Sequence, residues 1–190
     1  MSTAIQDIGA IREKWAEGVV ETVDFRGEHT VEVKLDSLAA IMAFCRKEAG
    51  FDLLLDMASL DHFGEHPRFE MVYELATIND SKHLRIRAKV AEDEEVPSVV
   101  SLWAGAEWHE REVYDMMGIR FKDHPDLRRI LMWEGYPFYP LRKDFPLAGR
   151  PSEMPDVAFS DKAPLEGGPF VTSAGAKGPV RREPRSREID

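Results

Sequence analysis

The chain has 190 residues, of which 43% are hydrophobic, and it carries a net charge of −10. This length allows one domain with a real core and an appendage. The acidic balance argues against nucleic acid as a partner, because proteins that bind it usually present a basic face. No run of about 18 apolar residues occurs and the N-terminal stretch does not resemble a signal peptide, so we expect membrane contact only through other proteins.

The single cysteine limits the redox chemistry of the chain. One thiol cannot form an intrachain disulfide, and an iron–sulfur cluster needs about four thiolates. Cys45 has apolar neighbours at helical spacing, which favours a buried structural thiol over a nucleophile. Glycine motifs for dinucleotides, phosphates or a hydrolase serine are absent from the sequence. We therefore expect no cofactor in this chain.

The first elements are predicted from apolar periodicity. Residues 5–15 have apolar side chains at helical spacing, and residues 19–25 and 30–35 alternate between apolar and polar side chains. These patterns predict a helix followed by a β-hairpin. Asp36 or Ser37 is then expected to cap a second helix.

The middle of the chain predicts a sheet and a long helix. Three strands are expected over residues 51–60, 68–78 and 84–90. A helix is expected from about Pro97 to Met117, with Gly118 at its C-terminal end. Hairpin-linked strands with few βαβ units predict an α+β fold in two layers, with a mixed or mostly antiparallel sheet and helices on one face.

The composition changes after Leu147. Residues 148–190 contain 5 Gly and 6 Pro and few large apolar side chains, so they cannot bury enough surface to fold alone. We predict a domain over residues 1–147 and an extended tail over 148–190. Docking of this tail on a partner is favoured over disorder.

Two clusters resemble metal sites. His109 and Glu110 begin like an H-E-x-x-H helix, but Val113 stands where the second histidine belongs. The other cluster comprises Asp61, His62, Glu65 and His66. A glycine and a proline in this segment argue against a helix that presents these side chains on one face, so a polar loop is favoured over a metal site. A stand-alone metal-dependent hydrolase is therefore a remote alternative.

Residues 108–147 combine dense charge with aromatic side chains. Glu107, Arg111 and Asp115 are spaced to form ion pairs along one helix face, and aromatics with arginines are typical of subunit interfaces. The alternative is a solvated charged face. For His124 a structural hydrogen bond is favoured over a role as proton carrier. The candidate interface residues are Glu110, Arg111, Glu112, Asp115, His124, Arg128, Arg129, Arg142, Lys143 and Asp144.

At these residues the sequence resembles a known family. The resemblance rests on Glu110-Arg111-Glu112 with Asp115, on His124 to Leu131, and on Pro140 to Leu147, which reads PLRKDFPL. The sequence is similar to the 30 kDa subunit of respiratory complex I, the bacterial NADH–quinone oxidoreductase. One departure is a longer turn over residues 134–140, which lacks the family's usual histidine.

The resemblance implies a peripheral subunit without redox groups or catalytic residues. Its partners would be the 49 kDa-type large subunit of complex I and the small subunit that carries an iron–sulfur cluster. Iron–sulfur clusters, FMN and quinone would be bound by partner subunits, on the cytoplasmic face of the bacterial plasma membrane. The complex would be a proton-translocating oxidoreductase. A related membrane-bound hydrogenase or formate hydrogenlyase is the alternative.

Overall fold

The structure is a computed structural model that describes residues 4–79 and 81–147. The predicted tail over 148–190 therefore lies outside the described residues. The elements follow the chain in the order α1 (Ala4–Lys14), β1 (Val19–Phe25), β2 (Glu28–Val33), α2 (Leu35–Lys47), β3 (Leu53–Asp61), β4 (Phe69–Ala76), β5 (His83–Val90), β6 (Glu95–Pro97), α3 (Ala106–Met117) and β7 (Arg120–Lys122).

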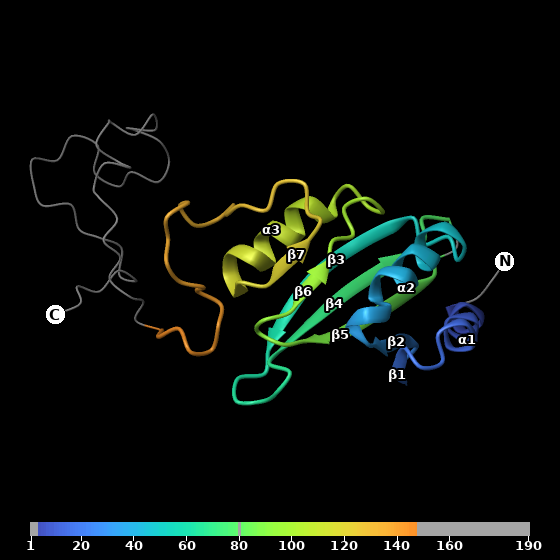
Figure 1. The fold of residues 1–190 in the computed structure, drawn as a ribbon. Coiled ribbons are helices and arrows are strands. Elements are labelled where there is room, and N and C mark those ends of the chain that lie inside the picture. The colour runs from blue at the N-terminus through green and yellow to red at the C-terminus, as the bar shows by residue number, and fades with distance from the viewer. Residues whose placement is uncertain (1–3, 80, 148–190) are drawn as a thin grey trace, which may run out of the picture.

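Five strands form one sheet in the order β1-β2-β5-β4-β3 (Figure 1). The pairing of β2 with β5 is parallel, and the other three pairings are antiparallel. The β1–β2 turn has positive φ at Arg26 and Gly27, as in the tight turns that suit hairpin twist. Strands β6 and β7 pair separately in parallel. The predicted α+β class with a mixed sheet is confirmed.

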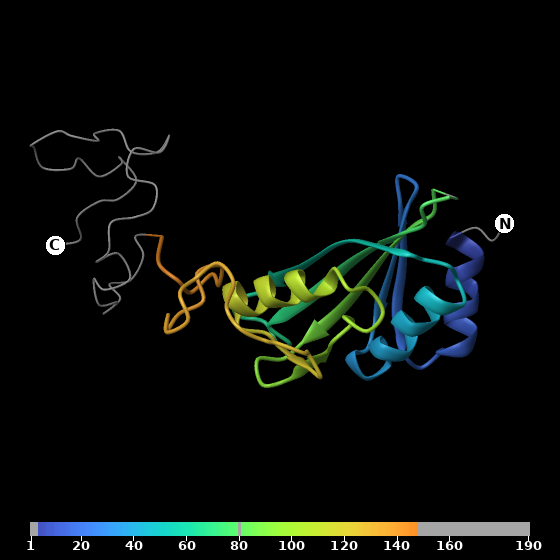
Figure 2. The same ribbon diagram turned by 90° about the horizontal axis from the view of Figure 1, so that it is seen from above.

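One face of the sheet carries the core. Alternate residues of β4 and β5, among them Met71, Tyr73 and Ile86, are fully buried. Apolar residues of all three helices join the same cluster, including Leu38 of α2 and Val113 of α3. Figure 2 shows the helices gathered on this side of the sheet. The predicted two-layer arrangement follows from this period-two burial.

The opposite face of the sheet is charged. Glu70 and Glu74 on β4 pair with Arg87 and Arg85 on β5, directly across the strands or on the diagonal. Arg85 also reaches Glu28 of β2 at 3.2 Å. These cross-strand pairs give the charged residues of β4 and β5 partners on the face of the sheet opposite the core.

Two predicted helix boundaries are wrong. The second helix begins at Leu35, so Asp36 and Ser37 lie inside it. Its N-cap is Lys34, whose side chain makes no capping hydrogen bond. The Lys34 N–H instead donates to the Gly18 carbonyl, and the chain enters the helix directly. The last helix begins at Ala106 rather than near Pro97, because Pro97 lies in β6 and the Ser98 N–H bonds Lys122 of β7.

Candidate functional site

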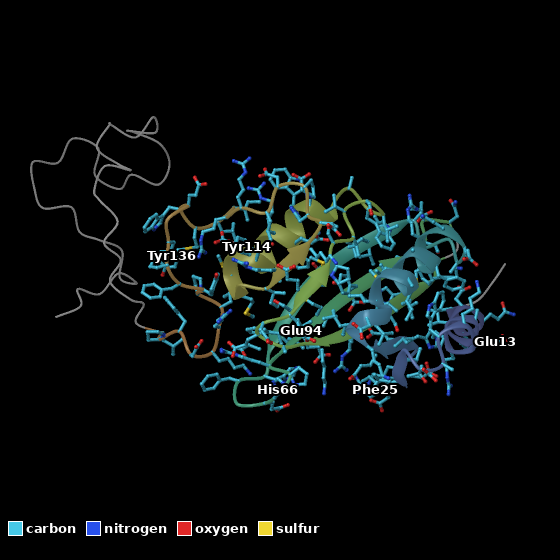
Figure 3. All side chains as sticks on the ribbon, viewed as in Figure 1. Glu13, Phe25, His66, Glu94, Tyr114 and Tyr136 are labelled. Carbon is cyan, nitrogen blue, oxygen red and sulfur yellow. The ribbon has the colours of Figure 1, made fainter. Side chains whose placement is uncertain are left out.

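The candidate site is built around residues 128–145, called the arm, which pack against the end of α3. Figure 3 places Tyr136 on the arm at one end of the molecule, and Glu13 on α1 at the other. The arm has no helix or strand, so its backbone donors must find partners elsewhere. Side chains of α3 and of the β3–β4 hairpin supply many of them.

Asp115 holds the first part of the arm. Its fully buried carboxylate accepts the backbone N–H groups of Ile130, Leu131 and Met132 at 2.7–3.0 Å on Oδ2. Its Oδ1 accepts from Arg129 at 2.6 Å. Burial by itself raises the pKa of Asp115, but these hydrogen bonds outweigh it and hold the pKa below its usual value. Asp115 is therefore a charged anchor inside the chain.

The arginines close the same junction. Arg111 donates to the carbonyls of Arg128 and Arg129, each at 3.1 Å. Arg129 donates to the Phe138 carbonyl at 3.1 Å. The predicted ladder of Glu107, Arg111 and Asp115 is thus wrong: the arginine points to the arm backbone, and Asp115 takes Arg129 instead.

The arm also caps the C-terminus of α3. Leu141 N–H donates to the Met116 carbonyl at 3.1 Å, and Arg142 Nε donates to the Met117 carbonyl at 2.6 Å. Helix ends leave such carbonyls free, and cations are favourable beside them. Gly118 follows with φ +76, as predicted for the helix stop, and a Cβ there would lie 2.7 Å from Tyr139.

A second anchor lies at the β3–β4 hairpin. Arg68 binds Asp61 through two hydrogen bonds of 2.8 and 2.9 Å. The arm joins this pair, because Lys143 N–H donates to Asp61 at 2.8 Å and Arg68 reaches Asp144 at 3.1 Å. Glu92 bridges Arg68 and Arg142. The hydrogen bonds from Arg68 are the main cause that lowers the pKa of Asp61.

This second anchor was not predicted from the sequence. Asp61 and His62 belong to a cluster that resembles a metal site, but Asp61 pairs with Arg68 and His62 pairs with Glu70 at 2.7 Å. One signal was present in the sequence. Asp61 and Arg68 flank the loop between two predicted strands, and such flanking positions meet across a hairpin.

Glu110 faces the interior instead of the arm. The residue is fully buried, and its Oε1 accepts the Val99 N–H at 2.7 Å. Burial raises the pKa of Glu110 to about 7, against the lowering effect of hydrogen bonds from Val99 and Ser98. His124 approaches from the β7 side and donates to the Glu107 carbonyl at 3.3 Å, which fits the structural role expected for it.

The remaining candidates lie at the surface. Glu112, Arg128, Lys143 and Asp144 are exposed. Large apolar side chains lie in the same region, with Trp108 58%, Leu131 62% and Leu141 58% exposed. The structure thus divides the predicted residues into an internal scaffold and an exposed set. Whether a partner contacts any of them stays a prediction.

A fixed, nonregular arm with exposed apolar side chains is typical of a protein that works as part of a larger assembly. The family model described as "Respiratory-chain NADH dehydrogenase, 30 Kd subunit" matches residues 31–151. The chain belongs to this family, as its resemblance predicted.

Relatives agree with this assignment. The chain is 45% identical over 140 residues to the NADH-quinone oxidoreductase C subunit of Geotalea uraniireducens, covering 73% of this chain and 85% of the relative. It is 42% identical over 166 residues to the NADH-quinone oxidoreductase C 2 subunit of Rhizobium etli, covering 85% and 80%. A solved chain of an archaeal membrane-bound sulfane sulfur reductase matches with TM-score 0.61 and 25% identity, over 75% of this chain and 85% of that one.

Proposed function

We propose that this chain is a non-redox peripheral subunit of a proton-translocating NADH:quinone oxidoreductase. It supports electron transfer by holding the quinone-reducing module together. Iron–sulfur clusters, FMN and quinone belong to partner subunits, and the chain supplies no catalytic residue. The names of its relatives favour this function over the equivalent role in a membrane-bound hydrogenase or formate hydrogenlyase.

The observation that carries the proposal is the arm. Asp115 and the Asp61–Arg68 pair fix it in one shape, and Leu131 and Leu141 remain exposed on it. Because the arm is already ordered, docking loses little conformational entropy. The buried ion pairs then hold the arm in one conformation and so define one surface. Buried ion pairs contribute little net stability, so this role fits them better than stabilising the fold.

The proposed partners are the 49 kDa-type large subunit of complex I and the small subunit that carries an iron–sulfur cluster. The complex places the chain on the cytoplasmic face of the bacterial plasma membrane. None of the helices in residues 4–79 and 81–147 is long and apolar enough to cross a membrane. Attachment through partner subunits is consistent with that finding.

The test is affinity purification of the tagged full chain from native membranes, with mass spectrometry of the recovered proteins. We expect the large subunit, the small cluster-bearing subunit and the flavin-binding subunits. Recovery of a nickel-bearing large subunit would instead indicate that the chain belongs to a membrane-bound hydrogenase or formate hydrogenlyase. Recovery of the chain alone would contradict the proposal.

A pair of variants locates the surface. Leu131→Asp puts a charge on the arm, where Leu131 is 62% exposed. Ile78→Asp puts the same charge on an apolar residue that is 70% exposed and lies between β4 and β5, beyond the end of β4 opposite the β3–β4 hairpin. We expect Leu131→Asp to lose the large subunit and Ile78→Asp to retain it. Equal recovery in both variants would place the interface elsewhere.

A further inference from the structure

Two buried polar atoms between the sheet and α3 have no hydrogen-bond partner among residues 4–79 and 81–147. They are the phenol oxygen of Tyr73 on β4 and Oε2 of Glu110 on α3. Both residues are fully buried. Native proteins pair nearly all buried polar atoms, so two orphaned oxygens close enough to interact electrostatically need a physical explanation.

Among the described residues, no lysine or arginine pairs with the Glu110 carboxyl. From the segment before α3, the Val99 N–H and the Ser98 hydroxyl bond to it. From β4 it faces the Tyr73 phenol, which is neutral because burial raises its pKa. From the segment after β7 it faces His124, whose Nε2 lies 3.9 Å from Oε2.

The hydrogen bonds of His124 assign a role to each of its ring nitrogens. Nδ1 lies 3.0 Å from the Asp126 backbone N–H, which can only donate, so Nδ1 is the accepting nitrogen. The ring hydrogen is then on Nε2, directed at the Glu107 carbonyl. An ionised Glu110 would consequently be a buried charge without a counterion, which is unfavourable.

We infer that Glu110 is a proton-binding site of the folded chain, protonated in mildly acidic solution and ionised in alkaline solution, and that its charge state controls how firmly α3 is held against the sheet. When the proton is bound to the carboxyl group, no buried charge remains at Glu110. When the proton leaves to water, an unpaired negative charge remains inside. The upward shift of the Glu110 pKa by burial agrees with this geometry.

The site is placed to affect the arm. Arg111, which follows Glu110 directly, and Asp115 lie on the same helix as Glu110. The side chains of Arg111 and Asp115 bind the arm backbone. Loosening α3 against the sheet therefore loosens the helix that holds the arm. Glu110 and its neighbours all belong to this chain, so proton binding there does not depend on the proposed function.

Infrared spectroscopy of the full chain labelled with ¹³C-glutamate tests the inference. We expect an acid carbonyl band at about pH 6 that is lost by about pH 8.5, as for a buried glutamate with a raised pKa. Glu110→Gln should lack the band, and Glu112→Gln, which changes an exposed residue on the same helix, should retain it. Absence of the band from the unsubstituted chain in the acidic sample would overturn the inference. So would its persistence in Glu110→Gln.

Stability provides a second test that does not depend on the spectroscopic signal. The folded-state pKa of Glu110 is raised, so the folded chain binds more protons than the unfolded one between the ordinary value of 4.5 and about 7. Stability should fall as the pH rises through this window. Glu110→Gln should flatten that fall, and Tyr73→Phe should fold and keep it, because the carboxyl remains. An unchanged slope in Glu110→Gln would overturn the inference even if that variant were less stable overall.

Discussion

Asp115 and Arg129 form an ion pair of 2.6 Å in which the Asp115 side chain is fully buried and the Arg129 side chain is 9% exposed. The same carboxylate carries three backbone N–H bonds from the residues that follow Arg129. A single side chain of α3 thus fixes the path of four successive residues. In the described part of the chain, no helix or strand forms backbone–backbone hydrogen bonds with residues 129–132.

Asp115→Asn should release the start of the arm. The amide keeps the size of the side chain but loses the charge. Its NH₂ group cannot accept a hydrogen bond, so either Arg129 or the three backbone N–H groups lose their acceptor. Breaking a buried pair in this way costs about 3–5 kcal/mol. Denaturant unfolding measures the loss, and limited proteolysis should show new cleavage within 128–132.

The matched control is Glu112→Gln, three residues earlier on the exposed side of α3. A surface change of this kind should stay within about 0.5 kcal/mol. If Asp115→Asn and Glu112→Gln unfolded at the same denaturant concentration, Asp115 would not be an anchor of the arm.

Arg68→Met should release the other end of the arm. The methionine retains the apolar stem but leaves Asp61, whose side chain is 1% exposed, without its counterion. We expect a loss of about 3–5 kcal/mol for an uncompensated buried charge. The double variant Asp61→Asn with Arg68→Met should recover part of this loss, because no charge is then left unpaired.

Arg128→Met is the control for the arginine. Arg128 pairs with Asp126 at the surface, with the side chains 62% and 50% exposed. Such a pair contributes roughly 0–1 kcal/mol. Additive losses in the Asp61–Arg68 cycle, with no recovery in the double variant, would show that the two side chains are not coupled.

Gly118→Ala should destabilise the junction of helix and arm. The backbone has φ +76, and the new methyl group would lie 2.7 Å from both Tyr139 and Arg142. Backbone strain of this kind costs about 1–3 kcal/mol. Gly9→Ala in the exposed side of α1 meets no atom within 4 Å and should instead stabilise by about 0.5–1 kcal/mol. A stabilising Gly118→Ala would mean that the arm does not pack on this glycine.

Periodic patterns predicted most of the fold. The alternation of Phe69, Met71, Tyr73 and Leu75 predicted β4 and its buried face correctly, because a period of two depends only on the strand itself. Cys45 is buried, as expected, and burial raises its pKa to about 12. The parallel pairing of β2 with β5 could not be predicted in this way, because it depends on contacts distant in sequence.

The candidate site was predicted less well. The dense charge over residues 108–147 marked the region that contains the arm. Helical spacing paired Arg111 with Asp115, whereas tertiary contacts direct both side chains to the arm. Pro97 fitted the first turn of a helix, yet pairing with Lys122 draws it into β6. Local rules fail at these positions because nonlocal hydrogen bonds to irregular backbone leave no periodic signal in the sequence.

The two anchors also predict an acid-sensitive arm. The pKa values of Asp61 and Asp115 are both below the ordinary value of 3.8 in the folded chain. Their contribution to stability is therefore complete above that value and is lost as the pH falls through the lowered pKa values. Fluorescence of Trp133, which lies within the arm, should change in this acidic range. In Asp115→Asn the change should be smaller, because one of the two titrating groups is gone. An acid transition identical in both proteins would show that Asp115 does not titrate with release of the arm.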